Sequence, residues 1–148
     1  MDRKSTCRFG ATGAVIALAA LLAAACGGND VTAPSPSPSD GPFNQTINGS
    51  VSMFGTTRHP LTVTRSGPMT VRLSWATSTV DLDLFLAPST CVELYPTSAC
   101  GVLAASDSAT GMTEEIRRPV TVGETFSIFV DNLNPTQPQT YTITVAIP

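Results

Sequence analysis

The segments MTVRLSW (residues 69–75) and VDLDLFL (residues 80–86) decide the fold, because apolar and polar side chains alternate in both. In the first, Val71, Leu73 and Trp75 alternate with polar residues, and in the second every other residue after Val80 is leucine. A period of two places alternate side chains on opposite faces of a β-strand. Each segment therefore predicts a strand with one face on a hydrophobic core and the other in water.

The same alternation recurs on both sides of these segments, at residues 61–64, 126–130 and 141–147. Weaker strands are predicted at Gln45–Met53, Gly101–Ser106 and Met112–Val122, and turn signals such as RSGP, VGE and NLNPTQPQ separate the strands. About seven to nine short strands without a helical period predict an all-β fold, an antiparallel, jelly-roll-like β-sandwich. The expected core is Leu61, Val63, Val71, Leu73, Trp75, Leu82, Leu84, Leu86, Phe126, Ile128, Val130, Tyr141, Ile143 and Val145.

The first 26 residues, MDRKSTCRFGATGAVIALAALLAAAC, begin with basic residues and continue with an apolar run that ends in small residues. This arrangement is typical of a secretory signal peptide. Its end resembles the lipobox of bacterial lipoproteins, although Ala23 replaces the usual leucine. The resemblance implies a signal peptide at residues 1–25 and lipidation of Cys26 by acyl chains such as palmitate. An ordinary signal peptide with a chance cysteine is the alternative.

Residues 26–42 join the lipidated cysteine to the folded domain, which is predicted to span residues 43–148. Alternating proline and serine in this stretch bury no apolar surface and are typical of a tether. By the same resemblance, Gly27 in place of aspartate favours the outer membrane or the cell surface, and a periplasm-facing position is the alternative. We therefore expect a lipid-anchored protein of the bacterial cell envelope.

The charge balance after Cys26 argues against nucleic acid as a partner. That part of the chain has five arginines and no lysine against ten aspartates and glutamates. Such a surface cannot release many counterions from a phosphate backbone.

The segments MTVRLSW, DLDLFL, ETFSIFVDN and YTITV, in this order, resemble the bacterial pre-peptidase C-terminal domain. The similarity covers Phe43 to Pro148 and departs from the family at residues 123–126, where Gly-Glu-Thr-Phe replaces Gly-Thr-Tyr. Such domains accompany secreted proteases, and relatives bind collagen-like or polysaccharide ligands, some with calcium. The resemblance therefore implies a non-catalytic accessory module.

Asp81 and Asp83 are the main candidates for a metal site, because they share one face of the predicted strand. Calcium takes six to eight oxygen ligands, and Asp131, Asn132, Asp107 or Glu93 are candidates to supply the remainder. A solvated strand face is the favoured alternative, and acid–base catalysis is the least favoured, because no nucleophile with a local base accompanies the pair. No other cofactor is expected.

The cysteines fall into two groups. Cys7 leaves with the signal peptide and Cys26 takes the lipid, so Cys91 and Cys100 remain as a pair. Export to an oxidising compartment favours a disulfide between them. The disulfide would close a loop that carries Val92, Leu94 and Tyr95, which would either preorganise a binding edge or protect the loop from proteolysis.

Catalytic motifs are missing from the sequence. His59, the single histidine, precedes Pro60 and is interpreted as a solvated turn residue, which excludes a multi-histidine zinc site. The sequence has no Gly-x-Ser-x-Gly, His-Glu-x-x-His or phosphate-binding glycine loop. We therefore expect a protein that is not an enzyme.

Three functions remain in view at this point. The first is a lipid-anchored binding or accessory module whose ligand is a matrix protein or a polysaccharide. The second is a scaffold that assembles with another envelope or secreted protein, and the third, the least favoured, is a hydrolase-associated enzyme. A binding module should present a concave face with exposed aromatic residues, for which Phe85, Phe129 and Tyr95 are the candidates, whereas a scaffold should present a flat apolar edge.

Overall fold

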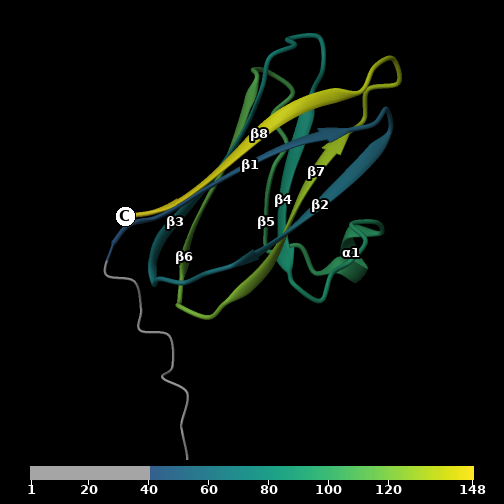
Figure 1. Cartoon of the computed structure of the whole chain (residues 1–148). Coiled ribbons are helices and arrows are strands. Elements are labelled where there is room, and N and C mark those ends of the chain that lie inside the picture. Colours follow the sequence, from purple (N-terminus) through teal and green to yellow (C-terminus); the bar gives the residue numbers. More distant parts are fainter. Residues whose placement is uncertain (1–40) are drawn as a thin grey trace, which may run out of the picture. The chain divides into compact units, whose positions relative to one another are not determined.

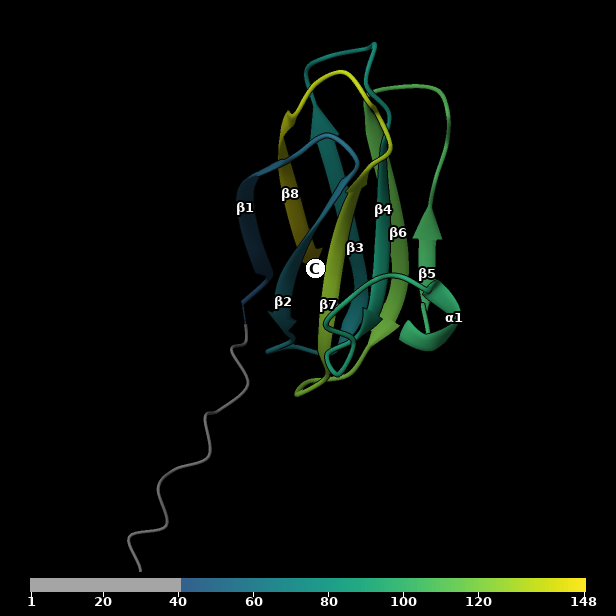
Figure 2. The same cartoon turned by 90° about the vertical axis from the view of Figure 1, so that its right-hand side faces the viewer.

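The computed structural model describes residues 41–148, and the predicted signal peptide, Cys26 and most of the tether lie outside them. The described residues form eight strands in two four-stranded antiparallel sheets that pack face to face as a β-sandwich (Figures 1 and 2). The strands are β1 (Phe43–Val51), β2 (Gly55–Thr62), β3 (Gly67–Trp75), β4 (Leu82–Pro88), β5 (Ala104–Ser106), β6 (Thr113–Val120), β7 (Thr125–Asn132) and β8 (Gln139–Ile147). One short helix, α1 (Thr97–Cys100), lies between β4 and β5. No helix within residues 41–148 is long and apolar enough to cross a membrane.

The strand order identifies the topology. One sheet has the order β1-β8-β3-β6 and the other β2-β7-β4-β5, so consecutive strands repeatedly cross from one sheet to the other. This is the double Greek-key arrangement of a jelly roll. The predicted fold class is therefore confirmed.

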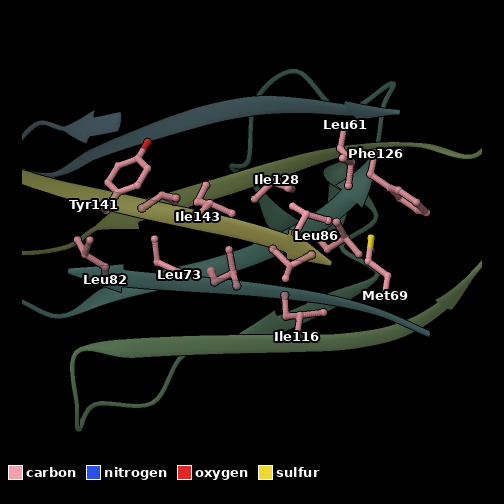
Figure 3. Packing of buried hydrophobic residues seen from close by; sticks show 14 of the residues in the cluster. Leu61, Met69, Leu73, Leu82, Leu86, Ile116, Phe126, Ile128, Tyr141 and Ile143 are labelled. Atoms are coloured by element: carbon pink, nitrogen blue, oxygen red, sulfur yellow. The ribbon is translucent and has the colours of Figure 1, made fainter. Parts of the chain in front are cut away.

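The core lies between the two sheets, and all fourteen residues predicted for it are buried (Figure 3). Leu82, Leu84 and Leu86 of β4 point into this core, while Asp83 and Phe85 point to the outer face of their sheet. The alternation in the sequence thus corresponds to the two faces of the strand. Met69, Val51, Val80, Ile116, Val120 and Ile147 complete the core.

The prediction for His59 and Pro60 was wrong. Both residues lie inside β2, where His59 pairs with Ile128 and Pro60 pairs with Ser127 of β7. A proline is tolerated there because β2 is the edge strand of its sheet, so the missing N–H group costs no ladder hydrogen bond on the open side. The strand begins at Gly55, well before the alternating segment at residues 61–64.

Different loops lie at the two ends of the sandwich. The first strand begins at one end, where Phe43 pairs with Ile147, and loops 63–66 and 121–124 lie at the same end. Loops 52–54, 76–81, 107–112 and 133–138 lie at the opposite end, which we call the distal end (upper end in Figures 1 and 2). The long segment from residue 89 to 103, which contains α1, folds against the sheet that contains β4 and β7.

Candidate functional site

The segment at residues 89–103, which we call the disulfide loop, is fixed to the outer face of the β2-β7-β4-β5 sheet. Cys91 and Cys100 are joined by a disulfide with their Cα atoms 5.1 Å apart, as the sequence predicted. Leu94 and both cysteines pack on Phe129 of β7 and form a second, smaller hydrophobic cluster. The outer face of β7 is therefore buried although the sequence pattern predicts a solvated one.

Hydrogen bonds with side chains of β2 and β7 also hold the disulfide loop on the sheet. The Ser127 hydroxyl donates to the Cys91 carbonyl at 2.9 Å, and the Arg58 guanidinium donates from Nη2 to the Ser89 carbonyl at 3.0 Å. The Tyr95 hydroxyl donates to the Asp131 carboxylate, whose other oxygen accepts from the Thr56 hydroxyl at 2.6 Å. Because these contacts lie on β2 and β7, the loop is fixed at several points along its length.

A cleft of about 260 Å³ lies between the disulfide loop and β2. Its lining consists of Thr56, Arg58, Val92, Glu93, Leu94, Tyr95 and Phe129. Val92 and Tyr95 are 67% and 52% exposed, although the loop that carries them has several anchoring contacts. The cleft therefore combines exposed apolar side chains with a rigid support.

Arg58 is the cation of this cleft. Its Nε donates to the Ser127 hydroxyl at 2.8 Å, which fixes the direction of the guanidinium. Within residues 41–148 both of its hydrogen bonds go to neutral oxygen atoms, those of Ser127 and Ser89, and it forms no salt bridge there. A half-buried, oriented guanidinium without a carboxylate partner is suited to a ligand oxygen.

The three aromatic residues predicted to be exposed differ in their positions. Tyr95 is exposed beside the cleft, Phe85 is half-buried against the smaller hydrophobic cluster, and Phe129 is only 1% exposed. The prediction for Phe129 was wrong because the disulfide loop covers it. Phe129 instead forms part of the cleft lining, beneath the loop.

The two aspartates singled out in the sequence lie near the distal end. Asp83 is in β4 directly opposite Asp131 of β7, whereas Asp81 is exposed and precedes β4 by one residue. Like charges directly opposite each other in a sheet repel. Burial, followed by the charges of neighbouring carboxylates, raises the pKa of Asp83 to about 6; the neighbours are Asp81, Asp131, Asp107 and Glu114.

Carboxylates thus gather near Asp83, but residues 41–148 contain no group of three or more His, Cys, Asp or Glu side chains arranged to hold a metal ion. The Asp131 carboxylate already accepts hydrogen bonds from the hydroxyl groups of Thr56 and Tyr95. The Asn132 amide donates to the backbone carbonyl groups of Ser52 and Gln137. Glu93 lines the cleft beside the disulfide loop. Calcium binding by Asp81 and Asp83 stays a prediction, which titration of the protein would test.

His59 has a structural contact that the sequence did not indicate. Its Nε2 lies 2.7 Å from the Tyr141 hydroxyl of β8, so a hydrogen bond joins the two sheets. Burial lowers the pKa of His59 and raises that of Tyr141. Gly49 makes room for this pair, because a Cβ atom there would lie 2.6 Å from the Tyr141 hydroxyl oxygen.

A second depression, of about 450 Å³, lies on the other sheet. It is lined by Asn48, Gly49, Ser74, Trp75, Ala76, Thr140, Tyr141 and Thr142, none of which carries a charge at neutral pH. It has no counterpart to the oriented guanidinium of Arg58. The cleft at the disulfide loop is therefore the stronger candidate for a ligand site.

Comparisons with known proteins give the fold but no family. No protein-family model matches the chain, and no curated protein matches it in sequence. A periplasmic inhibitor of g-type lysozyme from Aeromonas hydrophila has a similar structure, with a TM-score of 0.52, 11% identity and coverage of 74% of this chain and 90% of the inhibitor. The Yersinia pseudotuberculosis-derived mitogen matches at a TM-score of 0.50 and 16% identity, over 72% of this chain and 87% of the mitogen.

The pre-peptidase C-terminal domain of a collagenase from Bacillus anthracis also has a similar structure. Its TM-score is 0.50 at 17% identity, and the match covers 70% of this chain and 89% of that domain. This similarity agrees with the resemblance noted in the sequence, and at this identity it concerns the fold alone. The chain is therefore similar in fold to a pre-peptidase C-terminal domain and to a periplasmic lysozyme inhibitor.

Proposed function

We propose that this protein is a non-catalytic binding module of the bacterial cell envelope and that it binds a protein ligand in the cleft beside the disulfide loop. The observation that carries the proposal is the exposure of Val92 and Tyr95 on a loop that is fixed to the sheet beneath it. A loop held in one conformation loses little entropy when it binds, so its exposed apolar groups contribute more of their burial energy to affinity.

The chemistry of the cleft supports a protein ligand. Val92 and Tyr95 provide exposed apolar surface over the buried Leu94 and Phe129. Arg58 offers hydrogen-bond donors to a backbone carbonyl or a carboxylate. Two structural neighbours are consistent with this class of function, since one is named for inhibiting a lysozyme and another is the pre-peptidase C-terminal domain of a collagenase. A polysaccharide is the alternative ligand that the sequence resemblance suggests.

Attachment to the envelope is part of the proposal. Its support is the sequence, in which a lipobox-like segment ends at Cys26 and a proline- and serine-rich tether follows. Lipid on Cys26 would keep the domain at a membrane surface while the tether separates it from the headgroups. The binding cleft would then act on partners in the envelope or outside the cell.

An array of matrix proteins, envelope proteins and polysaccharides, probed with the full chain, would test the proposal. Affinity for the strongest ligand is then measured with Val92→Ser and with Val122→Ser, a matched control in the loop between β6 and β7. We expect Val92→Ser to weaken binding at least tenfold and Val122→Ser to leave it unchanged. Equal effects of the two substitutions, or a ligand that is a polysaccharide, would contradict the proposal.

A further inference from the structure

The distal end exposes large apolar side chains that the cleft does not use. Met53 and Phe54, in the turn between β1 and β2, are 48% and 69% exposed. Leu133, directly after β7, is 59% exposed, and its neighbour Asn132 pairs with Gly55. Three exposed apolar residues therefore lie on two loops that adjoin each other, which indicates an interaction surface.

Phe54 occupies a backbone conformation that does not favour it. Its φ of 49° lies in the left-handed region, where glycine and asparagine are favoured and a bulky side chain is rare. The turn is tight, since the Gly55 N–H donates to the Ser52 carbonyl at 3.1 Å. An aromatic residue at such a position costs stability and gains no burial, which points to a role outside folding.

The loops of the distal end are held together by hydrogen bonds. The Asn132 amide donates to the Ser52 carbonyl at 3.1 Å, and the Asn134 amide donates to the Thr79 carbonyl at 3.2 Å. These contacts connect loops 52–54, 76–81 and 133–138. The exposed apolar side chains are therefore presented by a braced surface, as at the centre of many protein interfaces.

The charge around this surface has one sign. Loops 52–54, 76–81, 107–112 and 133–138 contain no arginine, lysine or histidine. Asp81 and Asp107 lie on two of these loops, and Asp83, Asp131 and Glu114 lie in adjoining strands. Asp83 lies directly opposite Asp131 in the neighbouring strand, and the charges of the other carboxylates help to raise the pKa of Asp83. Asp131 and Glu114 are each only 2% exposed, so a partner meets an apolar surface beside the carboxylates of Asp81, Asp83 and Asp107.

We propose that the distal end is a docking surface for a positively charged protein, with Phe54 as its central apolar contact. Complementary charge speeds association and selects such a partner, while Phe54 provides affinity when the partner buries it. A second copy of this chain would bring carboxylates against carboxylates, and an anionic membrane would be repelled for the same reason. The distal surface adjoins the disulfide-loop cleft at Asp131, which accepts from Thr56 and Tyr95, but none of Met53, Phe54 and Leu133 lines that cleft.

Photo-crosslinking in the cells that produce the chain would identify the partner. The full chain carries p-benzoylphenylalanine either in place of Phe54 or, as a control, in place of Val122 at the other end of the sandwich. We expect an adduct with another protein from position 54 and none from position 122. An adduct with a second copy, an adduct with phospholipid, or equal adducts from both positions would overturn the proposal.

Affinity measurements with the purified partner complete the test. Phe54→Asn should keep or raise the melting temperature, since asparagine is favoured at this φ, and should weaken binding at least tenfold. Leu133→Ser is the second variant, and Val122→Ser is the control that should leave binding unchanged. Raising the salt concentration should also weaken binding. Affinity that survives both distal substitutions, or that does not depend on salt, would contradict a positively charged partner at this surface.

Discussion

Replacing Asp83 by asparagine should stabilise the protein at neutral pH and have no effect in acid. The structure places Asp83 opposite Asp131 in the adjoining strand, with Asp81, Asp107 and Glu114 near, and its pKa is raised from 3.8 to about 6 by burial and by these charges. The native protein therefore keeps a proton on Asp83 that the unfolded chain releases above about pH 4. Wild-type stability consequently falls as the pH rises from about 4 to 6.

The size of the effect follows from the pKa. A change from 3.8 to about 6 corresponds to about 3 kcal/mol if nothing screens the charges. The side chain is partly exposed, and solvent screening reduces such energies, so we expect Asp83→Asn to add about 1 kcal/mol to the unfolding free energy at pH 7. Below about pH 3.5 the aspartate is protonated in both states and the two proteins should be equally stable.

Urea denaturation of wild type and Asp83→Asn between pH 3.5 and pH 8 measures this difference directly. Glu93→Gln, which removes an exposed carboxylate from the disulfide loop, is the control for the loss of one negative charge. His59, whose pKa is lowered, makes stability rise with pH, opposite to Asp83. Subtracting the unfolding free energy of wild type from that of Asp83→Asn at each pH removes this contribution, because both proteins contain His59. A stabilisation that does not depend on pH, or a loss of stability at neutral pH, would refute the reasoning.

Four further predictions concern other parts of the chain. Cys91→Ser should lower the unfolding free energy by about 2.5–3 kcal/mol through lost loop closure to Cys100, measured by urea denaturation, and unchanged stability would contradict it. Tyr141→Phe should lower the unfolding free energy by about 1 kcal/mol at pH 8, because it removes the hydrogen bond to His59. Because burial lowers the pKa of His59, wild-type stability should also fall as the pH drops below about 6.5. A difference in unfolding free energy between wild type and Tyr141→Phe that does not change with pH would argue against this pair. Cys26→Ala should abolish labelling by radioactive palmitate, and labelling that persists in this variant would disprove lipidation at Cys26. Calcium and a chelator should give the same melting curve if the aspartates are only a charged strand face, whereas a calcium-dependent rise in melting temperature would establish a site.

The core could be predicted from the sequence because it depends on a local pattern. Leu82, Leu84 and Leu86 are buried as their alternation requires, and the same holds for the other core strands. His59 and Pro60 were missed because proline is a turn signal in isolation. Only the sheet order, which makes β2 an edge strand, shows why a proline fits there.

The candidate site could be predicted only in part, because its contacts join distant segments. The disulfide between Cys91 and Cys100 followed from the number of cysteines and the expected export. Nothing local in the sequence indicates that the disulfide loop covers Phe129 or that Tyr95 donates to Asp131. Phe129 was predicted to be exposed because alternation normally indicates one buried and one solvated strand face. Both faces of β7 are buried in the structure.

Hydrogen exchange of the full chain, with and without the ligand found on the array, tests the central claim most directly. If the ligand binds in the cleft, peptides that cover Val92 to Tyr95 and Thr56 to Arg58 should exchange more slowly in the complex. Protection confined to β3 and β8, whose residues line the depression on the other sheet, would contradict a binding site at the disulfide loop.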